Sequence, residues 1–381
     1  MNPTAADLRA TYAGKKVLLT GHTGFKGAWL TLWLERLGAK VTGFALEPEA
    51  KSVFLTAGVA ASCEHRVADV RSFAQVRDAV AACKPDLVLH LAAQALVRKS
   101  YDEPLATIET NINGTAHVLE AIRVTKQRCA VVVVSSDKCY ENREWVYGYR
   151  EDDAMGGHDP YSMSKGATEL VTSSWRRSFF PPSKVSEHGV RIASARAGNV
   201  IGGGDWAADR IVPDCIRSLA KGEPVGIRSP RAIRPWQHVL EPLGGYLLLG
   251  LRLLGAERPQ DFCEGWNFGP EAASAQPVAA LADALVKAWG RGEWVDQSDP
   301  RAHHEASLLR LSIDKAHARL GWQPRWNFEE TIARTVAWYR AQQDGAAVAD
   351  LRALTLEQIA AYEGPSQPLP APAGRGRPQA G

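Results

Sequence analysis

The chain has 381 residues, of which 45% are hydrophobic and 23% charged, so it can form one large globular domain or two coupled ones. Its formal net charge of +3 is small for this length and argues against a nucleic-acid-binding surface. No apolar stretch is long enough for a membrane span, and the N-terminus lacks the apolar core of a signal peptide. The six cysteines are scattered without zinc-ligand spacing, which predicts reduced thiols in a cytoplasmic protein without a metal.

Short apolar runs alternate with helical patterns over the first half of the chain. The runs that indicate buried strands cover residues 15–21, 40–46, 86–92, 130–136 and 189–200. The patterns with apolar residues at helical spacing cover residues 25–38, 72–83 and 105–125. Strands that alternate with helices of about a dozen residues are typical of an α/β fold with a parallel, doubly wound sheet.

The first expected strand ends in a glycine-rich loop with the pattern G-x-x-G-x-x-G at Gly21, Gly24 and Gly27. Between a strand and a helix, such glycines permit a tight turn, the close approach of a pyrophosphate and close packing of helix on strand. The free N–H groups at the helix N-terminus then face the phosphates. We therefore predict a dinucleotide site, with Thr23 and Phe25 of the loop among its contacts.

NAD is favoured over NADP at this site. Glu47 lies close to the expected position of the carboxylate that pairs with the adenine ribose, and no arginine stands there for a 2′-phosphate. Asp69, followed by Val70, is a candidate contact for the adenine, although a turn or surface carboxylate is equally expected. The remaining cofactor contacts are expected at the end of the strand over 86–92, from Leu91, Ala92 and Ala93.

The alternation of strands and helices loosens after residue 200. We predict a Rossmann-like NAD-binding domain over residues 12–200, to which a segment near 236–261 returns. Residues 201–235 and 262–345 are expected to form a smaller, mixed α/β substrate-binding domain. Residues 364–381 are rich in proline and glycine, have no apolar face to bury, and are predicted to be a disordered tail.

Tyr161 and Lys165 stand four residues apart and share one face of an expected helix that starts near Pro160. A phenol has an ordinary pKa of about 10, so Tyr161 acts as a base only where positive charge, such as the Lys165 ammonium, favours the phenolate. The same lysine is placed to hold the nicotinamide ribose. Downstream of the glycine loop, this pair predicts the oxidation of a hydroxyl with NAD. The alternative is an amphipathic surface pair.

Ser136 and Asp137 follow the strand over 130–136, at the carboxyl end where ligands bind in such sheets. We expect Ser136 to hydrogen-bond a substrate hydroxyl and Asp137 to donate a proton to a leaving hydroxyl. A serine–aspartate turn that caps the next segment is the alternative.

Together these residues resemble the nucleotide-sugar dehydratases of the extended short-chain dehydrogenase/reductase family. The resemblance covers about residues 12–345 and rests further on three strings, SSDKCY at 135–140, RAGNVIGGGDW at 196–206 and RPWQHV at 234–239. It implies that Tyr161 takes the proton of the sugar 4-hydroxyl while NAD accepts the C4 hydride. Water then leaves across C5–C6 with Asp137 as the acid, and the hydride returns to C6. The three strings resemble those of the family members that act on CDP-glucose. The resemblance therefore implies this substrate and a route to the deoxy sugars of cell-surface polysaccharide. The family also implies a homodimer.

The base that removes the C5 proton stays open. Many relatives carry a glutamate where this chain has Lys138, and in them the glutamate removes that proton. A lysine does so only as the neutral amine. Lys138 and Tyr161 are therefore both candidates.

The resemblance also implies substrate contacts. Asn199 is expected at the sugar diphosphate, and Arg234 is the best candidate for a pyrophosphate clamp because a guanidinium pairs bidentately with phosphate oxygens. A solvated surface role is equally expected for each arginine. The further candidate substrate contacts are Gln94, Arg210 and His238. Asn111 is expected to be structural, and His303 and His304 to lie in a polar loop without metal.

Two alternatives remain beside the dehydratase. One is another nucleotide-sugar enzyme, either a 4-epimerase or a dehydratase for a GDP- or dTDP-linked sugar. The other is a regulatory protein that binds NAD without turnover, against which the presence of both Tyr161 and Lys165 argues. The mass of the product separates the first group, because dehydration removes one water.

Overall fold

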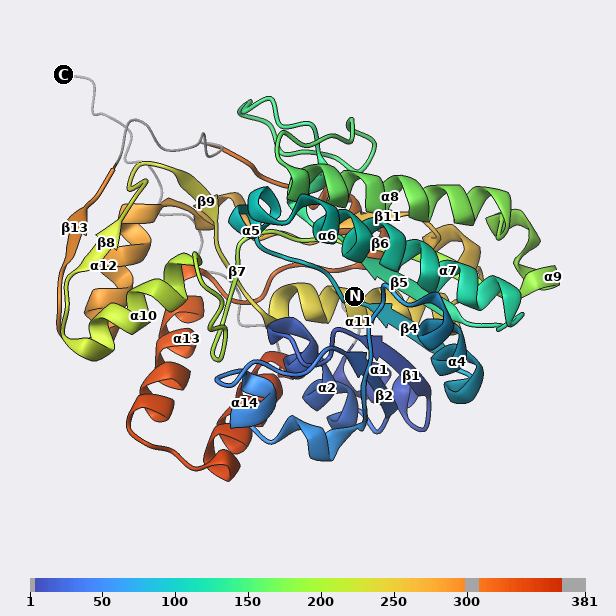
Figure 1. Ribbon diagram of the computed structural model, residues 1–381, viewed down its shortest axis with the longest axis horizontal. Coiled ribbons are helices and arrows are strands. Elements are labelled where there is room, and N and C mark those ends of the chain that lie inside the picture. Colours follow the sequence, from blue (N-terminus) through green and yellow to red (C-terminus); the bar gives the residue numbers. More distant parts are fainter. Residues whose placement is uncertain (1–3, 299–307, 365–381) are drawn as a thin grey trace, which may run out of the picture.

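A seven-stranded parallel sheet forms the centre of the computed structural model, which describes residues 4–298 and 308–364 (Figure 1). Its strands, in spatial order, are β11 (Gly265–Asn267), β6 (Arg191–Arg196), β5 (Ala130–Val134), β4 (Leu87–His90), β1 (Lys16–Thr20), β2 (Lys40–Ala45) and β3 (Glu64–Val67). The order reverses between β1 and β4, and ligands bind at the carboxyl ends of the strands beside such a switch point. The predicted doubly wound α/β fold is confirmed.

Helices cover both faces of this sheet. One face carries α4 (Phe73–Cys83), α7 (Gly114–Val124) and α8 (Pro160–Ser178), which bury apolar side chains against alternate strand residues. The other face carries α1 (Ala5–Tyr12), α2 (Phe25–Arg36) and α11 (Leu240–Gly255). Helix α11 packs on β5 and β6, within the segment near residues 236–261 that was expected to return to the sheet. Trp29 and Trp33 lie in the core on α2, as their helical spacing indicates.

A second unit lies beside the sheet, at the left of Figure 1, and contains α10 (Ile211–Lys221) and α12 (Val278–Trp289). Its strands pair two by two: β8 (Val225–Ile227) with β13 (Trp294–Asp296), β9 (Ile233–Pro235) with β12 (Ala275–Pro277), and β7 (Val200–Ile201) with β10 (Gln237–His238). The prediction that residues 262–345 all belong to this unit is wrong at β11. That three-residue strand extends the central sheet, and it is too short to show a periodic pattern.

The C-terminal helices α13 (Phe328–Gln343) and α14 (Val348–Glu363) were not predicted. Helix α14 packs on α2 and on α3 (Val53–Thr56), so the end of the described chain returns to the first domain. Arg352 on α14 donates to Glu35 at 2.6 Å, and Trp33 donates to Glu363 at 2.8 Å. The predicted disordered tail begins at Gly364, and its remaining residues, 365–381, lie outside the described residues.

Short helical segments complete the chain. The helix predicted over 105–125 is divided into α6 (Pro104–Ile108), the π-turn η2 (Glu109–Asn113) and α7. The other short helices are α5 (Val97–Asp102), α9 (Val185–His188), η1 (Val59–Ser62), η3 (Asp137–Cys139), η4 (Pro182–Lys184), η5 (Pro259–Phe262), η6 (Ala272–Ser274) and η7 (Ala316–Leu320). Within the described ranges, no helix has the length and apolarity that crossing a bilayer requires.

Candidate active site

The glycine loop joins β1 to α2 at the switch point of the sheet. Gly21 has a φ of +77°, and a Cβ there would lie 2.7 Å from the Ala92 nitrogen on the neighbouring strand end. A Cβ on Gly27 would lie 2.1 Å from the Gly21 carbonyl oxygen. At Gly24, by contrast, an added Cβ would meet only that carbonyl oxygen, at 3.4 Å. The fold therefore requires glycine at the first and third positions but not at the second.

The start of α2 is left without a side-chain cap. Gly24 is its N-cap residue and makes no side-chain hydrogen bond, so the first N–H groups of this 12-residue helix keep their donor capacity. The partial positive charge of a helix N-terminus adds to this. Thr23 donates to the Leu46 carbonyl at 3.0 Å and ties the loop to the end of β2. Phe25, the first residue of α2, faces the turn at Gly202. These features fit a diphosphate at the open face of Gly24.

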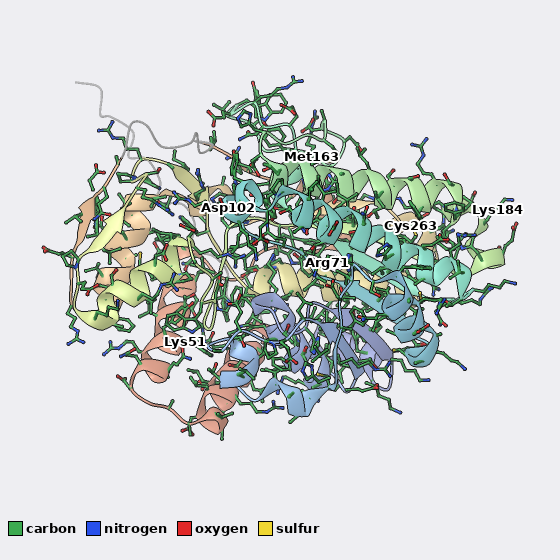
Figure 2. The ribbon with its side chains drawn as sticks, viewed as in Figure 1. Lys51, Arg71, Asp102, Met163, Lys184 and Cys263 are labelled. Carbon is green, nitrogen blue, oxygen red and sulfur yellow. The ribbon has the colours of Figure 1, made fainter. Side chains whose placement is uncertain are left out.

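The predicted adenine contact Asp69 lies just after β3. Its carboxylate accepts from the Arg71 guanidinium at 2.6 Å, and this hydrogen bond lowers the pKa of Asp69 (Arg71 is labelled in Figure 2). The Val70 carbonyl accepts from His117 at 2.8 Å. Glu47 is exposed beyond the end of β2. The turn thus has both a carboxylate and a guanidinium at the edge of the predicted cofactor site.

The end of β4 is fixed by a buried chain of hydrogen bonds. The Thr20 hydroxyl lies 2.7 Å from Nδ1 of His90 and accepts from the Ala92 N–H at 3.2 Å. Leu91, Ala92 and Ala93 are each partly buried and follow this point.

Gln94 does not fit the predicted role of a substrate contact. Its amide donates to Leu96 O and Thr107 Oγ1, and its carbonyl accepts from the Leu96 N–H. The side chain is thus engaged in shaping its own loop. Asn111 has the expected structural role, because it bonds the Gln94 backbone and donates to Ser164 on α8 at 2.8 Å.

Tyr161 and Lys165 lie in the first turns of α8. Asp159 caps this helix by accepting from the Ser162 N–H at 2.9 Å, and Pro160 is its first residue, as predicted. Both residues are buried: Tyr161 is 8% exposed and Lys165 is 4% exposed. Burial raises the pKa of Tyr161 to about 12, against which the Ser136 hydroxyl and the Arg210 charge act. Burial lowers the pKa of Lys165 to about 8.

Asp137 lies in η3, the single turn that follows β5. The carboxylate is buried, accepts from the Ser136 hydroxyl at 2.9 Å, and its charge raises the pKa of Tyr161. Ser136 also caps the turn by accepting from the Lys138 N–H at 3.2 Å. The structure therefore brings Ser136, Asp137 and Tyr161 together, and Lys138 follows on the same turn. The alternative interpretation, a serine–aspartate turn that caps the next segment, is also present, because Ser136 caps η3.

Sequence reasoning missed Lys26, which lies between the second and third glycines of the loop. Burial lowers its pKa to about 7, and the nearby charges of Arg210 and Lys165 lower it further, whereas those of Asp137 and Asp205 oppose this. Lys26 is thus part of the same charge cluster as the candidate catalytic groups. A lysine among glycines of a phosphate loop was the available signal.

Arg210 and Asn199 lie at the start of the second unit. Arg210 forms an ion pair with Asp205 at 2.7 Å. Its positive charge lowers the pKa of both Tyr161 and Lys26. Asn199 has a φ of +36°, a region that asparagine tolerates better than most residues and that occurs often at functional sites. Arg234 lies on β9, where its guanidinium donates to the Ile233 carbonyl.

The prediction of His238 as a substrate contact is contradicted. Its side chain is 0% exposed and packs edge-on against Trp29 and Trp326, with ring centroids 5.7 and 4.8 Å away. Burial lowers the pKa of His238 to about 3, so the ring is a neutral part of the aromatic core. The local sequence around His238, RPWQHV at 234–239, gave no sign of which face the side chain occupies.

The turn from Gly202 to Asp205 packs against the C-terminal helices. A Cβ on Gly203 would lie 2.0 Å from the Trp338 ring of α13, and Trp29 donates to the Gly203 carbonyl at 3.0 Å. Tyr339 donates to the Asp205 carbonyl. Asp205, which forms the ion pair with Arg210, therefore belongs to a turn that contacts with α2 and α13 hold in place.

Across residues 4–298 and 308–364, no group of three or more His, Cys, Asp or Glu side chains is arranged to hold a metal ion. His303 and His304 lie outside the described residues. All six cysteines are free thiols.

The fold and this site define an NAD-dependent enzyme of the Rossmann type, and the chain belongs to the NAD dependent epimerase/dehydratase family, which it matches over residues 17–251. It is 50% identical over 334 residues to CDP-glucose 4,6-dehydratase from Salmonella typhimurium, and the matched region covers 87% of this chain and 92% of that protein. It is 29% identical over 261 residues to dTDP-glucose 4,6-dehydratase from Streptomyces antibioticus, which covers 67% of this chain and 70% of that protein.

Solved structures show the same fold. A dTDP-glucose 4,6-dehydratase from Streptomyces venezuelae with NAD bound has a TM-score of 0.73 at 22% identity, over 86% of this chain and 98% of that one. A putative epimerase from Burkholderia cenocepacia has a TM-score of 0.71 at 26% identity, over 86% and 99%. The cofactor of this family is NAD, which agrees with the open position at Gly24 and the uncapped start of α2.

Proposed function

We propose that this chain is a CDP-glucose 4,6-dehydratase, which converts CDP-glucose to CDP-4-dehydro-6-deoxyglucose and water. The observation that carries the proposal is the 50% identity to the Salmonella enzyme over nearly the whole of both chains. The cluster of Tyr161, Ser136 and Asp137 supports it, because a dehydration after oxidation needs a base at one hydroxyl and an acid at another.

Tyr161 is proposed to take the proton of the sugar 4-hydroxyl. Its pKa of about 12 in the buried site means that the phenolate forms only with help from positive charge. Arg210 lowers this pKa, and Lys165 lies one turn further along α8. Ser136, which hydrogen-bonds Tyr161, is placed to hold the same sugar hydroxyl. NAD, when bound, would accept the C4 hydride, add positive charge near the phenol, and return the hydride to C6.

Asp137 is proposed to give its proton to the departing 6-hydroxyl. Removal of the C5 proton requires a second group, for which Lys138 and Tyr161 both stay candidates. Lys138 follows Asp137 directly in η3 and is partly buried, which suits a role at the sugar.

The cofactor contacts are proposed from the glycine loop and the two neighbouring strand ends. They are Gly21, Thr23, Gly24, Phe25, Gly27, Asp69, Val70, Leu91, Ala92 and Ala93, with Tyr161 and Lys165 at the nicotinamide ribose. Substrate contacts are proposed at Asn199, Arg210 and Arg234. Positive charge at Arg210, close to Tyr161, supports a position for the nucleotide sugar between the first domain and the second unit.

We further propose that the enzyme is a cytoplasmic homodimer. Apolar side chains are exposed along α6 and α8, where Leu105 is 73% exposed and Leu170 is 62% exposed (Met163, labelled in Figure 2, lies on the same helix as Leu170). A second copy of these helices would cover them. Sedimentation equilibrium of the wild type and of Leu170→Lys tests this. A monomeric wild type contradicts it.

The decisive experiment incubates the purified protein with CDP-, dTDP-, GDP- and UDP-glucose and measures the product masses. We expect one water to be lost from CDP-glucose alone. If none of the four loses water, the substrate assignment is refuted.

A 4-epimerase is the second candidate, since UDP-glucose 4-epimerase 3 from Oryza sativa is 27% identical over 357 residues. It would leave the mass unchanged and would not need Asp137. The buried contact of Asp137 with Ser136 favours the dehydratase.

A further inference from the structure

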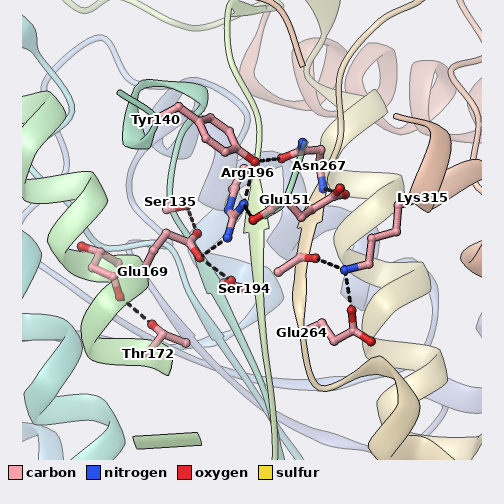
Figure 3. A network of polar contacts seen from close by, with 12 residues as sticks. Ser135, Tyr140, Glu151, Glu169, Thr172, Ser194, Arg196, Glu264, Asn267 and Lys315 are labelled. Carbon is pink, nitrogen blue, oxygen red and sulfur yellow. Dashed lines mark hydrogen bonds and ion pairs between the residues drawn. The ribbon is translucent and has the colours of Figure 1, made fainter. Parts of the chain in front are cut away.

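Behind the candidate site lies a buried ion pair between Glu169 on α8 and Arg196 at the end of β6 (Figure 3). The two groups are 2.9 Å apart, and their side chains are only 4% and 6% exposed. Both are ionised, because the charge of each stabilises the other: the pKa of Glu169 is lowered and that of Arg196 raised, despite burial.

Glu169 joins three elements of the sheet face. Its Oε1 accepts from the hydroxyl of Ser135, the residue directly before Ser136. Its Oε2 accepts from Ser194 on β6 at 2.6 Å and from Arg196 at 2.9 Å. Both carboxylate oxygens are therefore used, and the end of β5 is tied to α8 at this point.

Arg196 extends the network to the other end of the catalytic turn. It donates to the Tyr140 hydroxyl at 2.6 Å and lies 5.1 Å from the centre of that ring. Tyr140 is the residue directly after η3 and donates in turn to Asn267 on β11 at 2.8 Å. Arg196 also donates to the Glu151 carbonyl at 2.9 Å. Segment 136–139, which carries Ser136, Asp137 and Lys138, is thus held at both ends.

Stability alone gives a weak reason for such a pair. Burying two charges is costly, and apolar residues of similar volume are often as good or better for stability. Both carboxylate oxygens of Glu169 and both terminal nitrogens of the Arg196 guanidinium are hydrogen-bonded, whereas the buried Arg196 Nε has no partner. A buried network with this many bonds fixes one geometry. Here that geometry is the position of the turn with Asp137 relative to the helix with Tyr161 and Lys165.

We propose that Glu169 and Arg196 are positioning residues of the dehydration, which hold segment 136–139 against α8 and place the Glu169 carboxylate on the face of α8 that carries Lys165. The proposal rests on the proposed function for its catalytic part. It deepens that function by assigning a role to two residues that do not touch the reacting atoms.

The charge around Lys165 supports the second part. Burial lowers the pKa of Lys165, whereas Cys139 and Glu169 raise it. Glu169 lies four residues further along α8, on the same face. The groups that face Lys165 from other elements are Cys139 of η3, His90 of β4 and Lys26 of α2. Burial raises the pKa of the Cys139 thiol and lowers that of His90, so both are neutral near pH 7. Of these groups, Glu169 supplies the negative charge.

The test compares Glu169→Gln with the wild type in CDP-glucose dehydration. We expect kcat to fall about a hundredfold with KM little changed, since a shift of reacting groups by about 1 Å costs this much. The basic limb of the kcat–pH profile should move to lower pH by about one unit, because Lys165 loses its proton earlier without the anion. The ionisation of Lys165, followed by 13C NMR of lysine-labelled protein and assigned with Lys165→Arg, should move in the same direction.

A matched control is Glu241→Gln, which alters another buried carboxyl. Glu241 on α11 accepts from Tyr362 at 2.8 Å and from the N–H groups of Arg325 and Trp326. We expect it to change stability but neither the Lys165 ionisation nor the pH profile. If Glu169→Gln behaves like this control, its role is structural only and the proposal is overturned.

Two further variants keep the test decisive if Glu169→Gln does not fold because Arg196 is left unpaired. The double variant Glu169→Gln/Arg196→Met removes both charges and should recover stability while kcat stays low and the Lys165 ionisation stays shifted. Glu169→Asp keeps the charge and should leave the ionisation at its wild-type position while kcat falls. If the wild type dehydrates no nucleotide sugar, the proposed function fails, and the NMR measurement still decides the role of Glu169.

Discussion

The glycine loop offers a direct test of how the cofactor is held, through the pair Gly24→Ala and Gly27→Ala. A methyl group at Gly27 would lie 2.1 Å from the Gly21 carbonyl oxygen, so the backbone of the loop or of α2 must shift. Overpacking of this kind costs about 1–3 kcal/mol. With about 2–4 °C for each kcal/mol in chains of 150–250 residues, we expect the Tm of Gly27→Ala without ligand to fall by several degrees.

At Gly24 the same methyl group meets only ordinary contact, at 3.4 Å, and the backbone φ of −76° suits alanine. Alanine is a poorer N-cap than glycine but restricts the unfolded chain, and these effects oppose one another, so stability should change by less than about 1 kcal/mol. NAD binding should nevertheless weaken about ten- to a hundredfold, because a charge-assisted hydrogen bond to the pyrophosphate is worth about 1.5–3 kcal/mol.

Circular dichroism melting without ligand measures the stability of both variants, and calorimetric titration with NAD measures the affinity of the Gly24→Ala variant. Wild-type affinity in Gly24→Ala would refute the inference that its open face receives the pyrophosphate. A wild-type Tm in Gly27→Ala would refute the packing argument.

Three further predictions concern single side chains. Tyr161→Phe should abolish turnover while NAD still binds, measured by product mass and titration, and retained dehydration would sink the mechanism. Asp137→Asn should slow dehydration by about 10²–10⁴-fold. NADH absorbance should then rise when CDP-glucose is mixed with the holoenzyme, and an unchanged rate would exclude Asp137 as the acid. Burial raises the pKa of Glu241 from 4.5 to about 7, so the folded state binds its proton more tightly and stability is lost as pH rises through this range. Glu241→Gln should flatten that loss in urea unfolding from pH 4.5 to 7, and an equal slope in both proteins would contradict it.

The parts of the fold that sequence reasoning found are those with a local signal. Strands β1, β2, β4, β5 and β6 each lie in one of the apolar runs that predicted a strand, and α2 shows its helical spacing within a dozen residues. Tyr161 and Lys165 are neighbours on one helix turn. Strand β3, with its exposed and polar residues, was not predicted. Asp137 was found because the strand before it is a continuous run of apolar residues, which places its end.

The parts that were missed depend on partners far apart in the chain. Glu169 and Arg196 are 27 residues apart, and Glu241 and Tyr362 are 121 apart, so no local pattern announces either contact. His238 was assigned to the substrate from the resemblance of the string RPWQHV at 234–239. Such a short string cannot show which of its side chains face the core. Helix α14 was missed because its docking on α2 is decided by long-range contacts with residues such as Glu35.

The packing of Gly203 on Trp338 has a consequence for protein engineering. The turn from Asn199 to Trp206 is an obvious piece to transplant between relatives when a different nucleotide sugar is wanted. In this chain the glycine gives the indole its space, so a transplanted turn with any side chain at that place would push α13 outward. A smaller residue in place of the indole would leave a hole beneath the turn. A working chimera must therefore carry the turn and α13 together.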